Sequence, residues 1–202
     1  MKYPKVGPEG GTRWRRFAAA IVPTVAVVGA LGAGIASGAV PVSFAVSGVQ
    51  FKVTATHLHG DGFVQYGSIV QEKNGTPHAV AVSEIQSADL TNLCQSVAQK
   101  TPIGTIVLKL TAGDNGTKAH AENLLIDMTQ LKGDATFDHI NIGQDASDLS
   151  SHGAPGGFGQ AADHVDIDNL TQTAWATTAG TFLLPHLNLG LGDSSAECPD
   201  LS

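Results

Sequence analysis

Residues 17–40 read FAAAIVPTVAVVGALGAGIASGAV, and the rest of the chain is organised around this stretch. It carries no charged side chain, and as a helix it would be roughly 36 Å long, enough to cross a hydrocarbon core of about 30 Å. Three arginines lie directly before it, and residues 1–16 have a net charge of +4. Because positively charged flanks stay in the cytoplasm, we predict a basic cytoplasmic tail at 1–16 and an exterior domain at 41–202.

The apolar segment 17–40 fits two descriptions. It is either an uncleaved transmembrane anchor or a secretory signal segment, which has a shorter apolar core and a cleavage site of small residues. Ala36-Ser37-Gly38 is a passable site of that kind, although Pro41 would lie just past the cut. We therefore expect a membrane protein with its domain outside, or a secreted one if the segment is removed.

The composition beyond residue 40 predicts one acidic domain of about 160 residues, enough for a sizeable core. This part holds six lysines, no arginine and seventeen acidic residues, a net charge of −11. Binding to nucleic acid needs clustered cations, so we exclude it. Contact with the membrane is predicted through segment 17–40 alone.

The two cysteines of the chain, Cys94 and Cys198, both lie in the predicted exterior domain. Cysteines pair in oxidising compartments, so we predict a disulfide between them. A bridge across about 100 residues would stabilise the fold by up to roughly 4–5 kcal/mol in the chain-entropy treatment.

The pattern after the apolar segment is typical of strands. Phe44, Val46, Val49, Phe51 and Val53 nearly alternate with polar residues, with a slip at Gly48 that suggests a bulge. The dipeptides at 74–75 and 115–116 are Asn-Gly, the hairpin signal, and further breaks are expected at 133–134, at 155–157 and in a long loop over 145–160. We predict a mainly β fold.

Imperfect repeats run through the domain. AVSGVQ at 45–50 returns as AVSEIQ at 81–86, and HINIG at 139–143 returns as HLNLG at 186–190. A drifting period of about 40 residues fits a solenoid-like stack of β units, and a β-sandwich would give similar turn spacing. We favour the stack and keep the sandwich as the alternative.

The best metal candidate is His57-Leu58-His59 with Asp61. Residues two apart on a strand point the same way, so two imidazoles and a carboxylate would lie on one face. Zinc takes three or four ligands, and the sequence shows no second cluster of similar quality. We therefore predict exposed polar residues and no metal site.

Other polar groups also fit ordinary structural roles better than chemistry. Asp145 and Asp148 lie in a Gly-rich stretch but match no EF-hand spacing, and Gly192-Asp193-Ser194 copies the opening of the GDSL-hydrolase block without any later His. A further repeat, AENLLID at 121–127 and ADHVDID at 162–168, puts Asp127 and Asp168 at matched positions, where strand ends or turn caps explain them. We predict no catalytic residue, no cofactor site and no cofactor.

A string of blocks along the chain resembles a known family. The blocks are RWRRFA, SFAVSG, QFKV, GFVQYG, NLCQSV, AENLLID, LKGDATF, INIGQDAS and TTAGTF. They are similar to small actinobacterial proteins of unknown function with one N-terminal hydrophobic segment and an exterior β-rich domain. The resemblance implies little about activity: some members carry an automatic cholesterol esterase label, and a multi-span membrane protein is often encoded beside them.

These observations predict a non-enzymatic protein of the cell envelope that binds a partner or assembles at the membrane surface. The expected partners are a multi-span membrane protein, from the resemblance, or further copies of the chain. The alternatives are a lipid-ester hydrolase, which needs a serine activated by a histidine, and a lipid-binding carrier with an apolar cavity.

Overall fold

Nine strands make up most of the domain. The structure is a computed structural model that describes residues 46–201, and the predicted tail and apolar segment at 1–40 lie outside the described residues. By contacts the chain divides into two units, Met1–Phe44 and Ala45–Ser202. The elements are β1 (Phe51–Gln71), β2 (Pro77–Thr91), β3 (Leu93–Thr101), β4 (Gly104–Ala112), β5 (Ala119–Asp138), β6 (Asn141–Asp145), α2 (Ala146–Leu149), β7 (Phe158–Thr178), β8 (Thr181–Leu183), β9 (Asn188–Gly192) and the 3₁₀ turn η1 (Ser194–Ala196).

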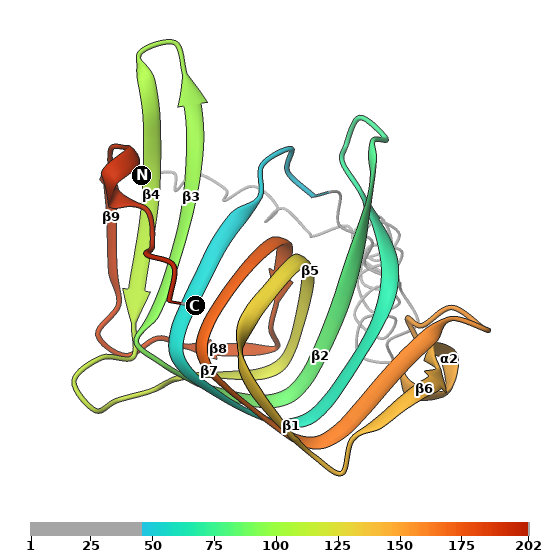
Figure 1. The fold of residues 1–202 in the computed structure, drawn as a ribbon. Helices are drawn as coiled ribbons and strands as arrows, with labels where there is room; N and C mark the ends of the chain where they lie inside the picture. The colour runs from blue at the N-terminus through green and yellow to red at the C-terminus, as the bar shows by residue number, and fades with distance from the viewer. Residues whose placement is uncertain (1–45, 202) are drawn as a thin grey trace, which may run out of the picture. The chain divides into compact units, whose positions relative to one another are not determined.

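The strands form one antiparallel sheet in the order β6-β7-β5-β2-β1-β3-β4-β9, with β8 against β5. Four long strands pair in a circuit, because β1 pairs with both β2 and β7, and β5 also pairs with both β2 and β7. Figure 1 shows β1, β5 and β7 as nested, strongly bent arcs, with β3, β4 and β9 standing together to one side. No helix in residues 46–201 is long and apolar enough to cross a membrane.

Asparagines in the left-handed conformation bend the chain within β5, within β7 and between β2 and β3. Asn92, Asn123 and Asn169 have φ of 52°, 50° and 52°, a region that asparagine tolerates better than most residues. Residues three apart on a regular strand point to opposite faces. Here Ile167 and Leu170, three apart across Asn169, are both buried in the same core cluster. The left-handed residue therefore turns the chain so that both flanks face one core.

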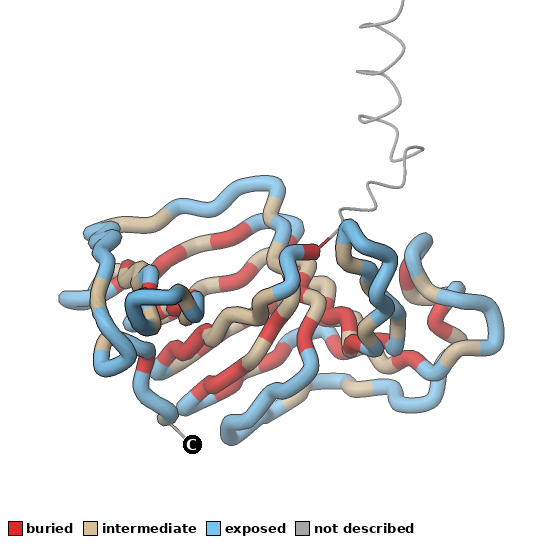
Figure 2. The backbone as a smooth tube through the Cα atoms, turned by 90° about the horizontal axis from the view of Figure 1, so that it is seen from above, coloured by how far each residue is buried: buried red, intermediate tan, exposed pale blue. Residues whose placement is uncertain are grey.

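The main core lies inside these bends. Its fully buried members come from every long strand, and Figure 2 shows the buried positions running along the inner strands while the connections are exposed. A second, smaller cluster contains Tyr66, Val80, Val82 and Ala146, which joins α2 to β1 and β2. Burial of these apolar side chains, at about 25 cal/mol per Å², is the main stabilising contribution.

The prediction of a mainly β fold is confirmed, and the arrangement of the strands differs from both predicted alternatives. A solenoid would stack short parallel strands and a sandwich would need two sheets, whereas this sheet is single and its named strands all pair antiparallel. Strands of 15 to 21 residues replace the expected short segments. The predicted break at 133–134 is a bulge inside β5, where Gly133 has φ of 148°.

Both Asn-Gly pairs lie in turns, but only the pair at 74–75 joins two paired strands, since 115–116 connects β4 to β5, which do not pair with each other. Asn115 and Gly116 both have positive φ, 53° and 82°, and the Thr117 N–H donates to the Asp114 carbonyl, which is a type I′ turn. At the first hairpin only Gly75 has positive φ, and its N–H donates to the Glu72 carbonyl, the pattern of a type I turn with a bulge.

The predicted disulfide Cys94–Cys198 is present, with Cα atoms 5.9 Å apart. It ties the C-terminal segment after η1 to β3. The Cys198 N–H also donates to Ser96 Oγ at 3.0 Å, and Lys52 Nζ lies 3.0 Å from Asp200. The C-terminal segment is thus fastened to β1 and β3.

Candidate functional site

The densest group of functional side chains lies on the outer face of β1 and β7. Leu58 and Gly60 point into the core, so His57, His59 and Asp61 point outward. The antiparallel register places the three rungs His57–Asp168, His59–Asp166 and Asp61–His164 side by side. We call these six residues the His–Asp face.

Hydrogen bonds connect the rungs into one network. Nδ1 of His57, His59 and His164 lies 2.8, 2.8 and 2.7 Å from Oδ1 of Asp168, Asp166 and Asp61 respectively. Further contacts cross between rungs: His57 Nε2 lies 3.3 Å from Asp166 Oδ1, and His59 Nε2 lies 3.5 Å from Asp61 Oδ1. The rings of His59 and His164 stack with centroids 6.1 Å apart.

The electrostatics of this face favour cations. The hydrogen bond to Asp166 raises the pKa of His59, and the charges of Asp166 and Asp61 act in the same direction, while burial and Lys118 oppose them. All six side chains are partly exposed, from 37% for His57 to 65% for Asp168. An external ion can therefore reach them.

A smaller pair continues the polar face onto β2 and β5. His120 Nδ1 lies 2.8 Å from Asp89 Oδ1, and this hydrogen bond lowers the pKa of Asp89. Lys118 Nζ lies 3.7 Å from the other oxygen of Asp89. Because an ammonium group already faces this carboxylate, the pair is a poorer cation site than the His–Asp face.

Sequence reasoning found half of the His–Asp face and missed the other half. The sequence predicted His57, His59 and Asp61 on one side of a strand, as the structure shows, but it indicated no further ligands. The missing side chains are His164, Asp166 and Asp168 on β7. Their alternation, His-Val-Asp-Ile-Asp, was the available signal, since it mirrors His-Leu-His-Gly-Asp on β1.

The remaining sequence candidates have structural surroundings. Asp145 accepts from Ser147 N–H and Oγ and from Gly156 N–H, so it caps α2, and these bonds lower its pKa. Ser194 lies in η1, where the neighbouring Asp193 caps Ser195. The structure does not bring Asp127 and Asp168 together. Asp127 of β5 lies opposite Ala176 of β7, eight positions along the strand from Asp168.

One serine does contact a histidine in the described part of the chain. Ser150 Oγ lies 3.4 Å from His152 Nδ1, but it donates to Glu84 Oε1 at 2.7 Å. Glu84 Oε1 also accepts from Tyr66 at 2.6 Å and lies 3.3 Å from the same His152 nitrogen. A catalytic histidine uses one nitrogen for the serine and the other for the acid. This cluster lacks that relay and fastens the segment after α2 to β2.

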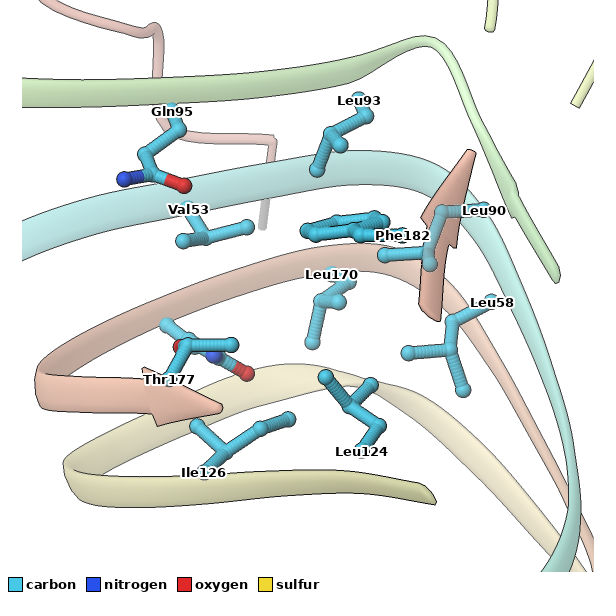
Figure 3. A pocket seen from close by; sticks show the side chains of 11 residues that line it. Val53, Leu58, Leu90, Leu93, Gln95, Leu124, Ile126, Leu170, Thr177 and Phe182 are labelled. Atoms are coloured by element: carbon cyan, nitrogen blue, oxygen red, sulfur yellow. The ribbon is translucent and has the colours of Figure 1, made fainter. Parts of the chain in front are cut away.

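An apolar cavity is present in the core but is small. Leu58, Leu90, Leu124, Leu170 and Phe182 point toward one another around it (Figure 3). Its volume is about 20 Å³, room for about one water molecule, whereas small-molecule sites occupy about 300–1,000 Å³. In this conformation it cannot hold a lipid.

A second exposed feature is the three-stranded unit of β3, β4 and β9, which we call the flap. One side is covered by the C-terminal segment: Val107 is fully buried there, and η1 packs against Gly192. The other side is apolar and partly exposed, since Leu110 packs against the main core while its neighbours reach solvent. Leu108 pairs with Leu191 and Leu110 with Leu189, and the exposed fractions of Leu108, Leu189 and Leu191 are 40%, 60% and 76%.

A family comparison covers most of this domain. The DUF6230 family, described as a family of unknown function, matches residues 47–199. The chain belongs to the DUF6230 family. The predicted resemblance to a family of unknown function is thereby confirmed, while the actinobacterial origin and the N-terminal segment stay predictions. No curated protein and no solved structure matches this DUF6230 chain.

Proposed function

We propose that the chain is a non-enzymatic protein of the cell envelope whose domain lies outside the membrane and self-associates through the flap. The single observation that carries this proposal is the open strand β9, which ends the sheet and presents exposed leucines. An edge strand with unpaired backbone groups and apolar side chains is a ready template for pairing with another chain.

Charge favours a second copy as the occupant of this edge. The domain is strongly acidic, so two copies repel each other over most of their surfaces. The flap strands, however, contain no Asp or Glu and two lysines, Lys100 and Lys109. Two flaps can therefore approach without the repulsion that other surfaces would meet.

The geometry of β9 suits a two-fold dimer. Antiparallel pairing of β9 with its own copy would be isologous. With the two-fold axis at Gly190, Leu189 of each chain would lie opposite Leu191 of the other. Gly190, between them, has nothing within 4 Å of the place where a Cβ would stand, so no side chain crowds that face of β9. The dimer would extend the sheet across both chains.

The test uses the full chain in mild detergent. We expect a dimer in sedimentation velocity, converted to monomer by Leu191→Asp. Ile69→Asp is the matched control, since Ile69 is similarly exposed, at 66%, but lies on β1. A monomeric wild-type chain, or a dimer unaffected by Leu191→Asp, would refute the proposal. Recovery of a multi-span membrane protein on the flap instead would identify a different occupant and refute self-association.

Cross-linking locates the contact more directly. In an antiparallel pair, directly opposed Cα atoms lie about 4.5–5.5 Å apart, within disulfide reach. We expect one of Leu189→Cys, Gly190→Cys and Leu191→Cys to give a disulfide-linked dimer on mild oxidation. Gly67→Cys, at an exposed strand glycine with open space, is the control that stays uncross-linked.

The hydrolase alternative is not favoured by the Ser150 cluster, because the serine proton is directed to Glu84 and not to a histidine base. The carrier alternative is not favoured, because the core cavity is only about 20 Å³ and the larger hollow of about 600 Å³ beside Ile69, Val80 and His152 is open to solvent. Labelling of Ser150 by a serine-directed phosphonate would support the hydrolase. Lipid that co-purifies in native mass spectrometry would support the carrier.

A further inference from the structure

We propose that His59, Asp61 and His164 form a binding site for a divalent transition-metal ion, Zn²⁺ in the first place. Each residue offers one ligand atom, and the three atoms lie within 4.8 Å of one another. They come from two adjacent strands and are placed together by the register in which Asp61 faces His164. This proposal does not depend on self-association, because the site lies on the outer side of β1 and β7 and the flap contact on β9.

The spacing fits a tetrahedral ion. Bonds of about 2.0–2.2 Å from zinc to nitrogen or oxygen put neighbouring ligand atoms about 3.3–3.5 Å apart. His59 Nε2 already lies 3.5 Å from Asp61 Oδ1. His164 Nδ1 lies 2.7 Å from the same oxygen, so this side chain has to move outward by about 0.7 Å to admit the ion. His164 is 50% exposed and has room for that movement.

One carboxylate behind the site, Asp166, holds the ligand His59. A metal-bound histidine usually donates its other ring N–H to a carboxylate, which fixes its tautomer and orientation. His59 has this arrangement, because its Nδ1 lies 2.8 Å from Asp166 while its Nε2 faces Asp61. Asp166 is held in turn by His57 Nε2 at 3.3 Å. His59 is therefore oriented toward the proposed ion before the ion binds.

The backbone under the site is rigid. β1 pairs on both sides at this level, since His59 lies opposite Asp89 of β2 and Asp166 of β7. Gly60, on the core side, leaves no room for a side chain between Ile85 and Val165. Sites built on strands hold ligands more closely than sites on loops, so little order has to be gained on binding.

The donor set selects the class of metal. Two imidazole nitrogens and one carboxylate oxygen suit Zn²⁺, Cu²⁺ or Ni²⁺, whereas Ca²⁺ takes six to eight oxygen ligands. Three protein ligands leave a fourth position to water or an external group. The site would thus hold an exchangeable ion at the surface of the domain.

The experiment measures Zn²⁺ binding by isothermal titration calorimetry on the full chain, without a histidine tag, after treatment with chelator. We expect one strong Zn²⁺ site per chain, and none for Ca²⁺. His164→Gln and His59→Gln should each weaken binding at least tenfold. His120→Gln is the matched control, because His120 is also bonded to an aspartate on the same polar face, at 2.8 Å, and should bind as the wild type does.

A spectroscopic measurement reports the ligands themselves. Cu²⁺ bound at the site should show nitrogen hyperfine splitting from two imidazoles, reduced to one in His164→Gln. Far-UV circular dichroism verifies that the variants are folded. Equal Zn²⁺ binding by the wild type and both ligand variants, or no binding by the wild type, would overturn the proposal. So would a loss of binding in His120→Gln equal to that in His164→Gln.

Discussion

Removing the disulfide should weaken the whole domain, not only the C-terminal segment. Cys94 and Cys198 are 104 residues apart in sequence, and the bridge closes a loop that contains most of the sheet. In the chain-entropy treatment a loop of this length lowers the entropy of the unfolded chain by an amount worth about 4.7 kcal/mol at 25 °C. The other attachments contribute less, since the partly exposed pair Lys52–Asp200 is worth at most about 1 kcal/mol.

The perturbation is the double substitution Cys94→Ala and Cys198→Ala, chosen because both sulfurs are buried and a serine hydroxyl would lack a partner. Urea unfolding followed by far-UV circular dichroism measures the midpoint. With a slope of about 2 kcal/mol per molar urea, the expected loss moves the midpoint down by about 2 M. Wild-type protein with reductant should give the same shift.

Two outcomes would refute this reasoning. A midpoint within a few tenths of a molar of the oxidised wild type would mean that the unfolded chain gains little freedom from losing the bridge. A transition that splits in two would mean that the flap opens separately. The flap joins β1 through only three register pairs, from Lys52 to Thr54, so hydrogen exchange of β3 and β4 amides distinguishes the two cases.

Three further predictions concern single positions and the same urea assay. Asn169→Val should cost about 1–3 kcal/mol because a β-branched residue resists the φ of 52°, while Asn169→Gly should be nearly neutral. Leu124→Ala, at a core position 3% exposed, should cost about 2–5 kcal/mol, whereas Leu183→Ala, 61% exposed, should cost little. Burial raises the pKa of Asp127, so the free energy of unfolding falls as the pH rises from the ordinary carboxyl pKa to the raised one, and the loss is complete above it. Asp127→Asn should therefore stabilise the domain at pH 7 and give no gain near pH 3, where the carboxyl is protonated in both states; an equal gain at both pH values would contradict this.

The sequence predicted the class of the fold because alternation and turn residues are local signals. Phe51 and Val53 indicated β1 correctly, and the turn at 115–116 has the predicted type, but the hairpin predicted there is wrong because β4 and β5 do not pair with each other. The length of the strands could not be predicted from the sequence, because a Gly or Asn inside a strand resembles a break between two strands. Gly133 is such a case: its φ of 148° makes a bulge in β5, and the strand continues past it.

The bends could have been inferred only by comparing distant dipeptides. Asn-Leu occurs four times, and at 92–93, 123–124 and 169–170 the asparagine is left-handed and the leucine buried, whereas at 188–189 the leucine is exposed. The predicted repeat of HINIG and HLNLG does correspond to structure. His139 and His186 have φ of 53° and 54°, and each precedes a strand at the end of the sheet, β6 or β9. Both strands lead into an Asp-capped helical turn.

The candidate site was half visible because strand register is not a local property. Period-two alternation placed His57, His59 and Asp61 on one face, but nothing within β1 indicates that β7 lies beside it with Asp61 opposite His164. A slip of one residue would have turned His164 and Asp166 into the core. The ligand set therefore depends on the pairing of segments more than 100 residues apart in sequence.

Composition explains why histidines and carboxylates meet so often in this domain. It has no arginine, and all eight histidines lie beside a carboxylate, with nitrogen–oxygen distances of 2.7–3.3 Å. Pairing alone is thus ordinary here and does not mark a site. The His–Asp face differs because His57 and His59 each have a carboxylate within 3.5 Å of both ring nitrogens, and Asp61 and Asp166 each contact two histidines. One oxygen of Asp61 thus faces His59 Nε2 and His164 Nδ1 at once, and an ion bound among the three atoms would take the place of the proton between His164 and Asp61.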